Sequence, residues 1–403
     1  MANQTNATFA AMLKTLWFTG EIQNLALKNN PFLGMVPKKT DFYGDGLKIP
    51  LSYADLQGRS ATFANAQAQS TPSKYAAFTI TRAPTDYAIG RVDGETLETS
   101  QSNKGAFMAA LEAEIKRGRN SITRSLAVKL FRSPVGIMGR TITVAGVTNS
   151  TFTVSTADSY NIEVGMTLGA VDVDTGAGVP RSGSAIVSAI DRQTSATTAT
   201  VSFTGTITSF TSLDYVFVAG DYNGAISGLA AWVPDSAPSS TSFFGVNRTL
   251  DVTRLGGMRF TSSAPIEEAF QDALAELYLA GSSPTHAFMN PLDFKNLINA
   301  LGAKVVRTKV MGTAGTGYSA VEVDSPAGTI KVLADPNCPK LHVYILQMDT
   351  WCLYSCKEAP HILEYGGGEI LRMGDQDAVE FRMGYRAQLG CSAPGYNAVL
   401  ILS

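Results

Sequence analysis

The sequence predicts an α+β protein made of several distinct segments, and three observations indicate this class. Apolar and polar residues alternate between Thr40 and Val92, apolar residues recur every three or four positions over about Asn103–Arg132, and both patterns occur after Ser262. Alternation is typical of half-buried strands, whereas a spacing of three to four is typical of one helix face. A chain of 403 residues exceeds one ordinary core, so we expect two or three packed units.

Composition excludes several classes of protein. Hydrophobic residues make up 45% and charged residues only 16%, which indicates a globular chain whose surface is partly covered by partners. The net charge of −2 argues against a protein whose whole body binds nucleic acid. Four cysteines do not make a disulfide scaffold and fit reduced thiols of a bacterial-type cytoplasm. The first residues are not a signal peptide, and no run of about 18 apolar residues predicts a membrane span.

Residues 1–40 are typical of an arm and not of a domain. Short apolar groups, including Trp17, Phe18 and Phe32, are mixed with Asn, Lys and Pro. Exposed aromatic residues of this kind need a surface to lie against. We therefore expect Trp17, Phe18 and Phe32 to contact another subunit.

Residues 41–92 predict a long two-stranded hairpin. Leu47, Ile49 and Leu51 alternate with polar residues, as do Phe78 and Ile80, and a polar, small-residue stretch from 55 to 73 separates the two runs. An isolated two-stranded ribbon is only marginally stable in water. We expect the hairpin to rest on a neighbouring subunit, with inter-subunit contacts at the three residues Arg59, Phe63 and Arg82.

The strongest helical pattern lies in the next segment, residues 93–139. One apolar stripe contains Phe107, Leu111, Ile115, Gly118, Ile122, Leu126 and Leu130. The helix extends about 45 Å at 1.5 Å per residue, and Gly118 allows another backbone to approach. Its cations Lys116, Arg117, Arg119 and Arg124 can touch nucleic-acid phosphates without sequence choice. The alternative is a solvated or inter-subunit face.

Two further segments follow. Residues 140–220 are rich in Thr, Val, Ser, Ala and Gly and contain five short strand-like runs, which indicates a small β-barrel or sandwich inserted into the chain. Residues 221–403 are α/β: a helix follows Ser263 and Pro265, and a second follows the Asn290-Pro291 cap. Strands are expected at 286–289, 330–333, 341–346, 379–385 and 398–402.

No constellation in the sequence predicts catalysis. Of the three histidines, His286 and His342 lie in strand patterns and are expected to be packed or hydrogen-bonded. Cys352, Cys356 and His361 form a weak metal pattern, because a second ligand pair is absent downstream, and a shared strand face explains the two cysteines equally well. The run Gly312–Gly317 lacks the lysine of a phosphate-binding loop and reads as a surface loop. We predict no catalytic, cofactor or metal residue and no cofactor.

Four stretches of the sequence are distinctive: Gly44-Asp-Gly-Leu-Lys-Ile-Pro-Leu51, Gly224-Ala-Ile-Ser-Gly-Leu-Ala-Ala-Trp-Val-Pro234, His286-Ala-Phe-Met-Asn-Pro-Leu-Asp293 and Val332-Leu-Ala-Asp-Pro-Asn-Cys-Pro339. In these stretches and in the order of its segments, the chain resembles the major capsid proteins of tailed bacteriophages with the HK97 fold. The resemblance implies an N-terminal arm, an extended loop, a spine helix, a peripheral domain and an axial domain. Residues 140–220 look like a domain inserted in only part of that family.

The resemblance also implies a function. The expected protein is a major capsid protein that self-assembles into hexamers and pentamers of an icosahedral or prolate head around double-stranded DNA. Its expected partners are many copies of itself, a portal, a separate scaffolding protein, a decoration protein and the packaged DNA, with no membrane. It would reside in the virion capsid after assembly in the host cytoplasm. Because the arm begins near Met1, no cleaved scaffolding segment is expected. Hinges are expected at Gly44–Gly46 and Gly90.

Two alternative functions remain open at the level of sequence. An encapsulin-like compartment has the same fold and differs in its contents. A phage tail or decoration protein is also rich in strands, but the long helix and the α/β segment argue against it. An α/β enzyme would need a polar constellation that the sequence lacks.

Overall fold

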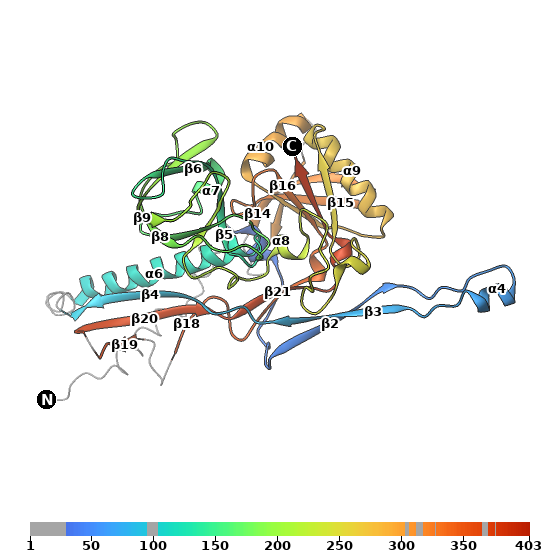
Figure 1. Ribbon diagram of the computed structural model, residues 1–403, viewed down its shortest axis with the longest axis horizontal. Helices are drawn as coiled ribbons and strands as arrows, with labels where there is room; N and C mark the ends of the chain where they lie inside the picture. The colour runs from blue at the N-terminus through green and yellow to red at the C-terminus, as the bar shows by residue number, and fades with distance from the viewer. Residues whose placement is uncertain are drawn as a thin grey trace.

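The structure is a computed structural model that describes residues 30–94, 104–302, 306–311, 317–326, 328–364, 370–374 and 376–403, without the side chains of 104–113 and 306–307. The predicted contact residues Trp17 and Phe18 therefore lie outside the described residues. A long base forms the lower part of the molecule, and two lobes, a β-barrel and an α/β unit, stand side by side on it (Figure 1). A two-stranded hairpin extends from one end of the base.

The predicted hairpin is confirmed for two strands. Strand β2 (Gly46–Ala54) pairs in antiparallel fashion with β3 (Lys74–Thr81), with Ile49 opposite Phe78. The tip carries a short helix, α4 (Phe63–Ala68), which has no buried residue. Residues 86–93, which the sequence analysis groups with the hairpin, form a separate strand of the base.

The base contains the long helix α6 (Lys104–Lys129) packed on β4 (Asp86–Asp93) and β20 (Ala378–Tyr385). Strand β20 pairs with β4 along one edge, and with β18 (His361–Ile362) and β19 (Ile370–Arg372) along the other. The stripe residues Ile115, Ile122 and Leu126 are buried, as predicted. Phe107 and Leu111 have no described side chains.

Two glycines in the base permit close packing of a ring. A Cβ at Gly118 would lie 3.3 Å from Cε2 of Phe381, so an aromatic side chain, and not the predicted backbone, approaches the helix there. A Cβ at Gly90 would overlap the same Phe381 ring. Gly90 is therefore a packing position in a paired strand, and the predicted hinge at this residue is wrong. Gly44, with φ +83° and open space around it, retains the conformational freedom of a turn.

The strands between residues 137 and 218 close into a barrel, one of the two alternatives that the sequence allowed. Its order is β10-β5-β6-β9-β8-β7. The bounds are β5 (Ile137–Val144), β6 (Thr151–Ser155), β7 (Thr167–Val171), β8 (Gly183–Asp191), β9 (Thr198–Ile207) and β10 (Tyr215–Val218), with helix α7 (Thr156–Ser159). Phe152, Phe203 and Phe210 meet inside with ring centroids 5.5–6.1 Å apart.

The second lobe is a seven-stranded sheet with two helices on one face. The order is β11-β22-β16-β12-β15-β14-β13. The bounds are β11 (Met258–Ser262), β12 (His286–Met289), β13 (Val306–Met311), β14 (Gly317–Ser325), β15 (Gly328–Ala334), β16 (His342–Leu346), β22 (Ala398–Leu402), α9 (Ile266–Leu279) and α10 (Pro291–Leu301). The predicted cap is confirmed, because the Asn290 side chain accepts a 3.1 Å hydrogen bond from the Leu292 N–H.

A shared core joins the lobes to the base. It contains residues of helices α3 (Pro31–Met35) and α8 (Leu229–Trp232), of the 3-10 turn η4 (Met348–Thr350) and of strands β17 (Trp351–Ser355) and β21 (Ala387–Cys391). Strand β1 (Lys38–Lys39) pairs with β17, and two further 3-10 turns are η2 (Arg248–Leu250) and η5 (Pro394–Tyr396). Trp232 and Trp351 are fully buried there with ring centroids 6.4 Å apart.

Phe32, predicted as an inter-subunit contact, belongs to this core instead. Its ring is fully buried and meets Phe131 and Phe288 at centroid distances of 5.3 and 5.2 Å. The Phe32 N–H donates a 3.0 Å hydrogen bond to Asp335, whose Oδ1 accepts from the Asn337 N–H at 2.9 Å. Residues 31–36 are thus fastened to the body and are not a free part of an arm.

Asp335 makes the stability of this anchor depend on pH. Complete burial raises the pKa of its carboxyl from 3.8 to about 6. The folded chain therefore holds this proton more tightly than the unfolded chain, and that contribution is complete below pH 3.8 and is lost as the pH rises through 6. Asp335→Asn should gain about 2 kcal/mol relative to the parent between pH 4 and pH 7. Urea unfolding of the unassembled subunit at both pH values measures the difference in free energy of unfolding between variant and parent. If this difference is the same at both pH values, the pKa of Asp335 is not raised by folding.

Candidate inter-subunit surfaces

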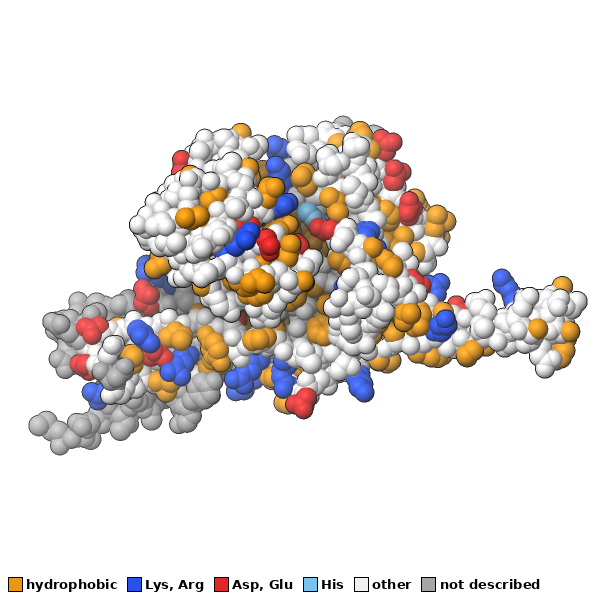
Figure 2. Space-filling model, in the orientation of Figure 1, with side chains coloured by type: hydrophobic (Ala, Val, Ile, Leu, Met, Phe, Trp, Pro, Cys, Tyr) orange, Lys and Arg blue, Asp and Glu red, His pale blue; other side chains and the backbone are white. Residues whose placement is uncertain are grey.

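The hairpin tip presents apolar side chains to solvent, which appear in orange at the right end of the molecule (Figure 2). Phe63 at the start of α4 is 83% exposed, and Leu56 and Tyr75 are exposed beside it. The tip has a defined shape, because Gln57 and Thr71 exchange two backbone hydrogen bonds of 3.0 Å. Arg59, the second predicted contact of the tip, is also exposed. An ordered, projecting, apolar tip is suited to bind another surface.

The other end of the hairpin is fixed to the body. Phe78 is fully buried and meets Trp232 edge-on at 5.1 Å between centroids, and the Thr79 N–H donates to the Phe244 carbonyl at 2.8 Å. Arg82, a predicted inter-subunit contact, donates to the Phe42 carbonyl at 3.1 Å and to the Gly44 carbonyl, and its guanidinium lies over the Phe42 ring. Arg82 thus closes the hairpin base within its own chain.

A second exposed face lies on the base, on the side of β4 and β20 away from α6. Phe381 points toward Gly118, so its neighbours in the strand point to the opposite side. There Tyr87 and Ile89 are exposed, Ile89 by 54%, and the buried Glu380 pairs with Arg91 at 2.9 Å and with Arg382 at 2.5 Å. Sequence reasoning missed this face, although the alternation of Tyr87, Ile89 and Arg91 indicates it.

The cations of α6 differ in accessibility: the side chain of Arg117 is 77% exposed and that of Arg124 is 38% exposed. Arg117 pairs with Glu114 at 2.9 Å, and Arg124 pairs with Glu163 of the barrel. Burial lowers the pKa of the Arg119 guanidinium, although Glu358 opposes this shift. Lys116 is exposed. In its C-terminal part, the helix lies between the β4–β20 layer and the barrel (Figure 1).

A buried ionic junction connects the base to the end of the barrel. Lys129 at the end of α6 is 3% exposed, and its ammonium lies 2.8 Å from Asp86 and 2.7 Å from Asp221. The Asp86 carboxylate also accepts 2.8 Å hydrogen bonds from Ser125 and Tyr385. Burial opposes the charge on Lys129, but the two carboxylates outweigh it and raise the pKa of the ammonium. Three segments distant in sequence therefore depend on one cation.

The weak metal pattern does not assemble. Cys352 is buried, Cys356 contacts the Phe42 carbonyl at 3.3 Å, and the His361 Nδ1 lies 2.7 Å from the Glu358 carbonyl. Within the described ranges, no group of three or more His, Cys, Asp or Glu side chains could hold a metal ion. The run Gly312–Gly317 joins β13 to β14, and residues 312–316 lie outside the description. No helix among the described residues is long and apolar enough to cross a bilayer.

Comparison with known proteins decides the class. A family model described as SU10 major capsid protein matches residues 162–362, about half of the chain. The capsid asymmetric unit of cyanophage A-1(L) has a similar fold, with 13% identity, 93% of both chains covered and a TM-score of 0.54. The chain is a phage major capsid protein. Its mixed α/β class and HK97-like fold agree with the sequence prediction.

Other solved structures resemble this capsid protein with TM-scores below 0.5. The capsid of a native GTA particle has 9% identity, covers 91% of this chain and 88% of its own, and gives a TM-score of 0.44. The structure from Mycobacterium phage Bobi has 10% identity, covers 93% of this chain and 91% of its own, and gives a TM-score of 0.42. No curated protein matches the sequence.

Proposed function

We propose that this capsid protein assembles into hexamers and pentamers of a closed icosahedral or prolate head that encloses double-stranded DNA. One observation carries the proposal: a hairpin anchored at Phe78 holds an apolar tip, with Phe63 83% exposed, far from the body (Figure 1). Exposing these apolar side chains to water costs free energy. Burying them on another subunit removes that cost.

The exposed face of β4 offers a surface for the tip. Tyr87 and Ile89 provide apolar area, and the Arg91–Glu380–Arg382 group borders it. Burying a large apolar side chain contributes about 1.5–3 kcal/mol. A contact of this strength is weak alone, but every subunit of a shell repeats it, so the assembled particle is stable.

The segments take the following roles in this proposal. Residues 1–40 include the arm, 41–92 the extended hairpin, 93–139 the spine helix α6, 140–220 an inserted barrel, and 221–403 the remaining peripheral and the axial parts. During maturation the hairpin would swing about Gly44–Gly46, where Gly44 has a positive φ, and this movement would also have to release Phe78 from its contact with Trp232. The barrel stands beside the α/β unit (Figure 1). In the shell it would project outward and contact neighbouring subunits.

The proposed partners follow from shell formation. A portal, a separate scaffolding protein and a decoration protein would bind the shell, and Lys116, Arg117, Arg119 and Arg124 would contribute sequence-independent contacts to packaged DNA. Assembly would occur in the host cytoplasm, and the product would be the virion capsid. The chain would act without catalysis, cofactor or membrane.

Nuclease protection of particle contents tests the enclosed cargo. Particles purified after expression with the neighbouring genes should retain double-stranded DNA that resists added DNase until the shells are opened. Uniform particles that hold protein cargo and no protected DNA would instead favour an encapsulin-like compartment.

A further inference from the structure

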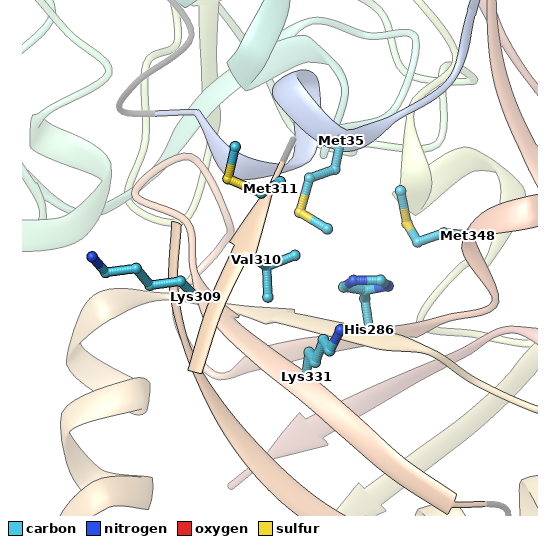
Figure 3. A pocket seen from close by; sticks show the side chains of 7 residues that line it. All are labelled: Met35, His286, Lys309, Val310, Met311, Lys331 and Met348. Atoms are coloured by element: carbon cyan, nitrogen blue, oxygen red, sulfur yellow. The ribbon is translucent and has the colours of Figure 1, made fainter. Parts of the chain in front are cut away.

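A pocket of about 350 Å³ opens where α3 meets the sheet of the α/β unit (Figure 3). Three methionines from separate elements, Met35, Met311 and Met348, form an apolar wall. His286 and Lys331 come from adjacent strands in register, and Lys309 lies on the edge strand β13. Met311 is 67% exposed. Methionine side chains adapt to irregular partners, which suits a binding surface.

The charge in this pocket is not balanced by its lining. Burial, aided by the Lys331 ammonium, lowers the pKa of His286 to about 4, so the imidazole is neutral near pH 7. Neither lysine forms an ion pair with another described residue, and the lining contains no Asp or Glu. Glu322 faces Lys331 across the β14–β15 pairing but does not line the pocket. The pocket therefore favours an anionic group attached to an apolar one.

The end of α9 has the complementary character. Leu279 is 85% exposed, Tyr278 is exposed beside it, and Asp272 and Glu276 lie one turn apart on the same helix. The helix has two further acids, Glu267 and Glu268, and no basic residue. This chain therefore carries, on one helix, an exposed apolar side chain and a carboxylate that can pair with a lysine.

Within one chain the two surfaces cannot meet. The α9 residues pack with Ala287 and Val332 on one face of the sheet. His286 and Lys331 are neighbours of these residues in their strands and therefore point to the opposite face, with Phe288. A contact between them must join two copies head to tail, and a repeated contact of this type closes into a ring when the rotation closes.

We propose that Leu279 and Glu276 of one copy dock in the methionine and lysine pocket of the next copy, and that this contact sets the ring of subunits in a capsomer. The inference rests on the proposed shell function and adds its axial contact. Leu279 would lie against Met35 and Met311, and the Glu276 carboxylate would pair with Lys309, with Lys331 behind it.

Charge exchange tests the contact. Lys309→Glu and Glu276→Lys alone should each lower the yield of shells at least tenfold, and the double variant should recover most of it. Lys295→Glu, an exposed change on α10 outside the pocket, is the control and should assemble like the parent. Thermal unfolding checks that each subunit folds. Single variants that assemble normally, or folded single and double variants that all fail, overturn the contact.

Cross-linking separates this contact from shell formation itself. Leu279→Cys with Met311→Cys, treated with a short bismaleimide, should give a ladder of up to six linked copies on a denaturing gel, and either single cysteine should not. The native thiols are present in all three samples and set the background. A parent that forms no shells contradicts the proposed function, whereas a parent that forms shells without a ladder in the double-cysteine variant contradicts only the docking contact.

Discussion

Replacing residues 55–73 by Asn-Gly should abolish closed shells while the subunit stays folded. Helix α4, which the deletion removes, has no buried residue, and the apolar side chains of Leu56 and Phe63 in the tip are exposed. Ala54 and Lys74, which the new turn would join, are paired in the parent hairpin, and Asn-Gly fits a two-residue turn. The loss therefore falls on assembly and leaves the core intact.

The yield of sedimenting shells and the midpoint of subunit unfolding measure this result together. A milder variant, Leu56→Ser with Phe63→Ser, should lower the yield at least tenfold without changing the midpoint. Val179→Ser, at a barrel position that is 79% exposed, is the matched control and should assemble normally. Normal shells from the deletion variant would show that the tip makes no essential contact.

Lys129→Ala should lower the free energy of unfolding by about 3–5 kcal/mol, because it leaves the partly buried carboxylates of Asp86 and Asp221 without their cation. The raised pKa of Lys129 fixes the pH range of the effect. The contribution is complete below the ordinary lysine pKa of 10.5 and is lost only as the pH rises through the higher folded value.

Urea unfolding of the subunit at pH 7 and pH 9 measures this loss, which should be the same at both. Arg117→Ala on the same helix removes an exposed ion pair with Glu114 and should change the free energy by about 0.5 kcal/mol or less. If Lys129→Ala costs no more than this control, the junction does not stabilise the base.

Local patterns predicted the elements whose environment is uniform along their length. Ile115, Ile122 and Leu126 face one layer, so their spacing reveals α6, and the Asn290-Pro291 pair reveals the start of α10 from local cap chemistry alone. The strands β2 and β3 follow equally from alternation. These features depend on neighbours within a few residues.

The sequence did not predict features that depend on distant partners. Strand β7 shows no alternation, because four of its five residues are buried and Gly169 packs under the Phe217 ring. The packing role of Gly90 depends on Phe381, and the fixed position of Phe32 depends on its hydrogen bond to Asp335. Both partners lie about 300 residues away in the sequence. The face of Tyr87 and Ile89 and the pocket around Lys309 arise from contacts across the fold, so no local pattern identified them.

Electron microscopy of the chain expressed alone and with its neighbouring genes tests the central claim most directly. The account predicts closed polyhedral particles of uniform size that require the hairpin tip. A monodisperse monomer or small oligomer under every condition would contradict it.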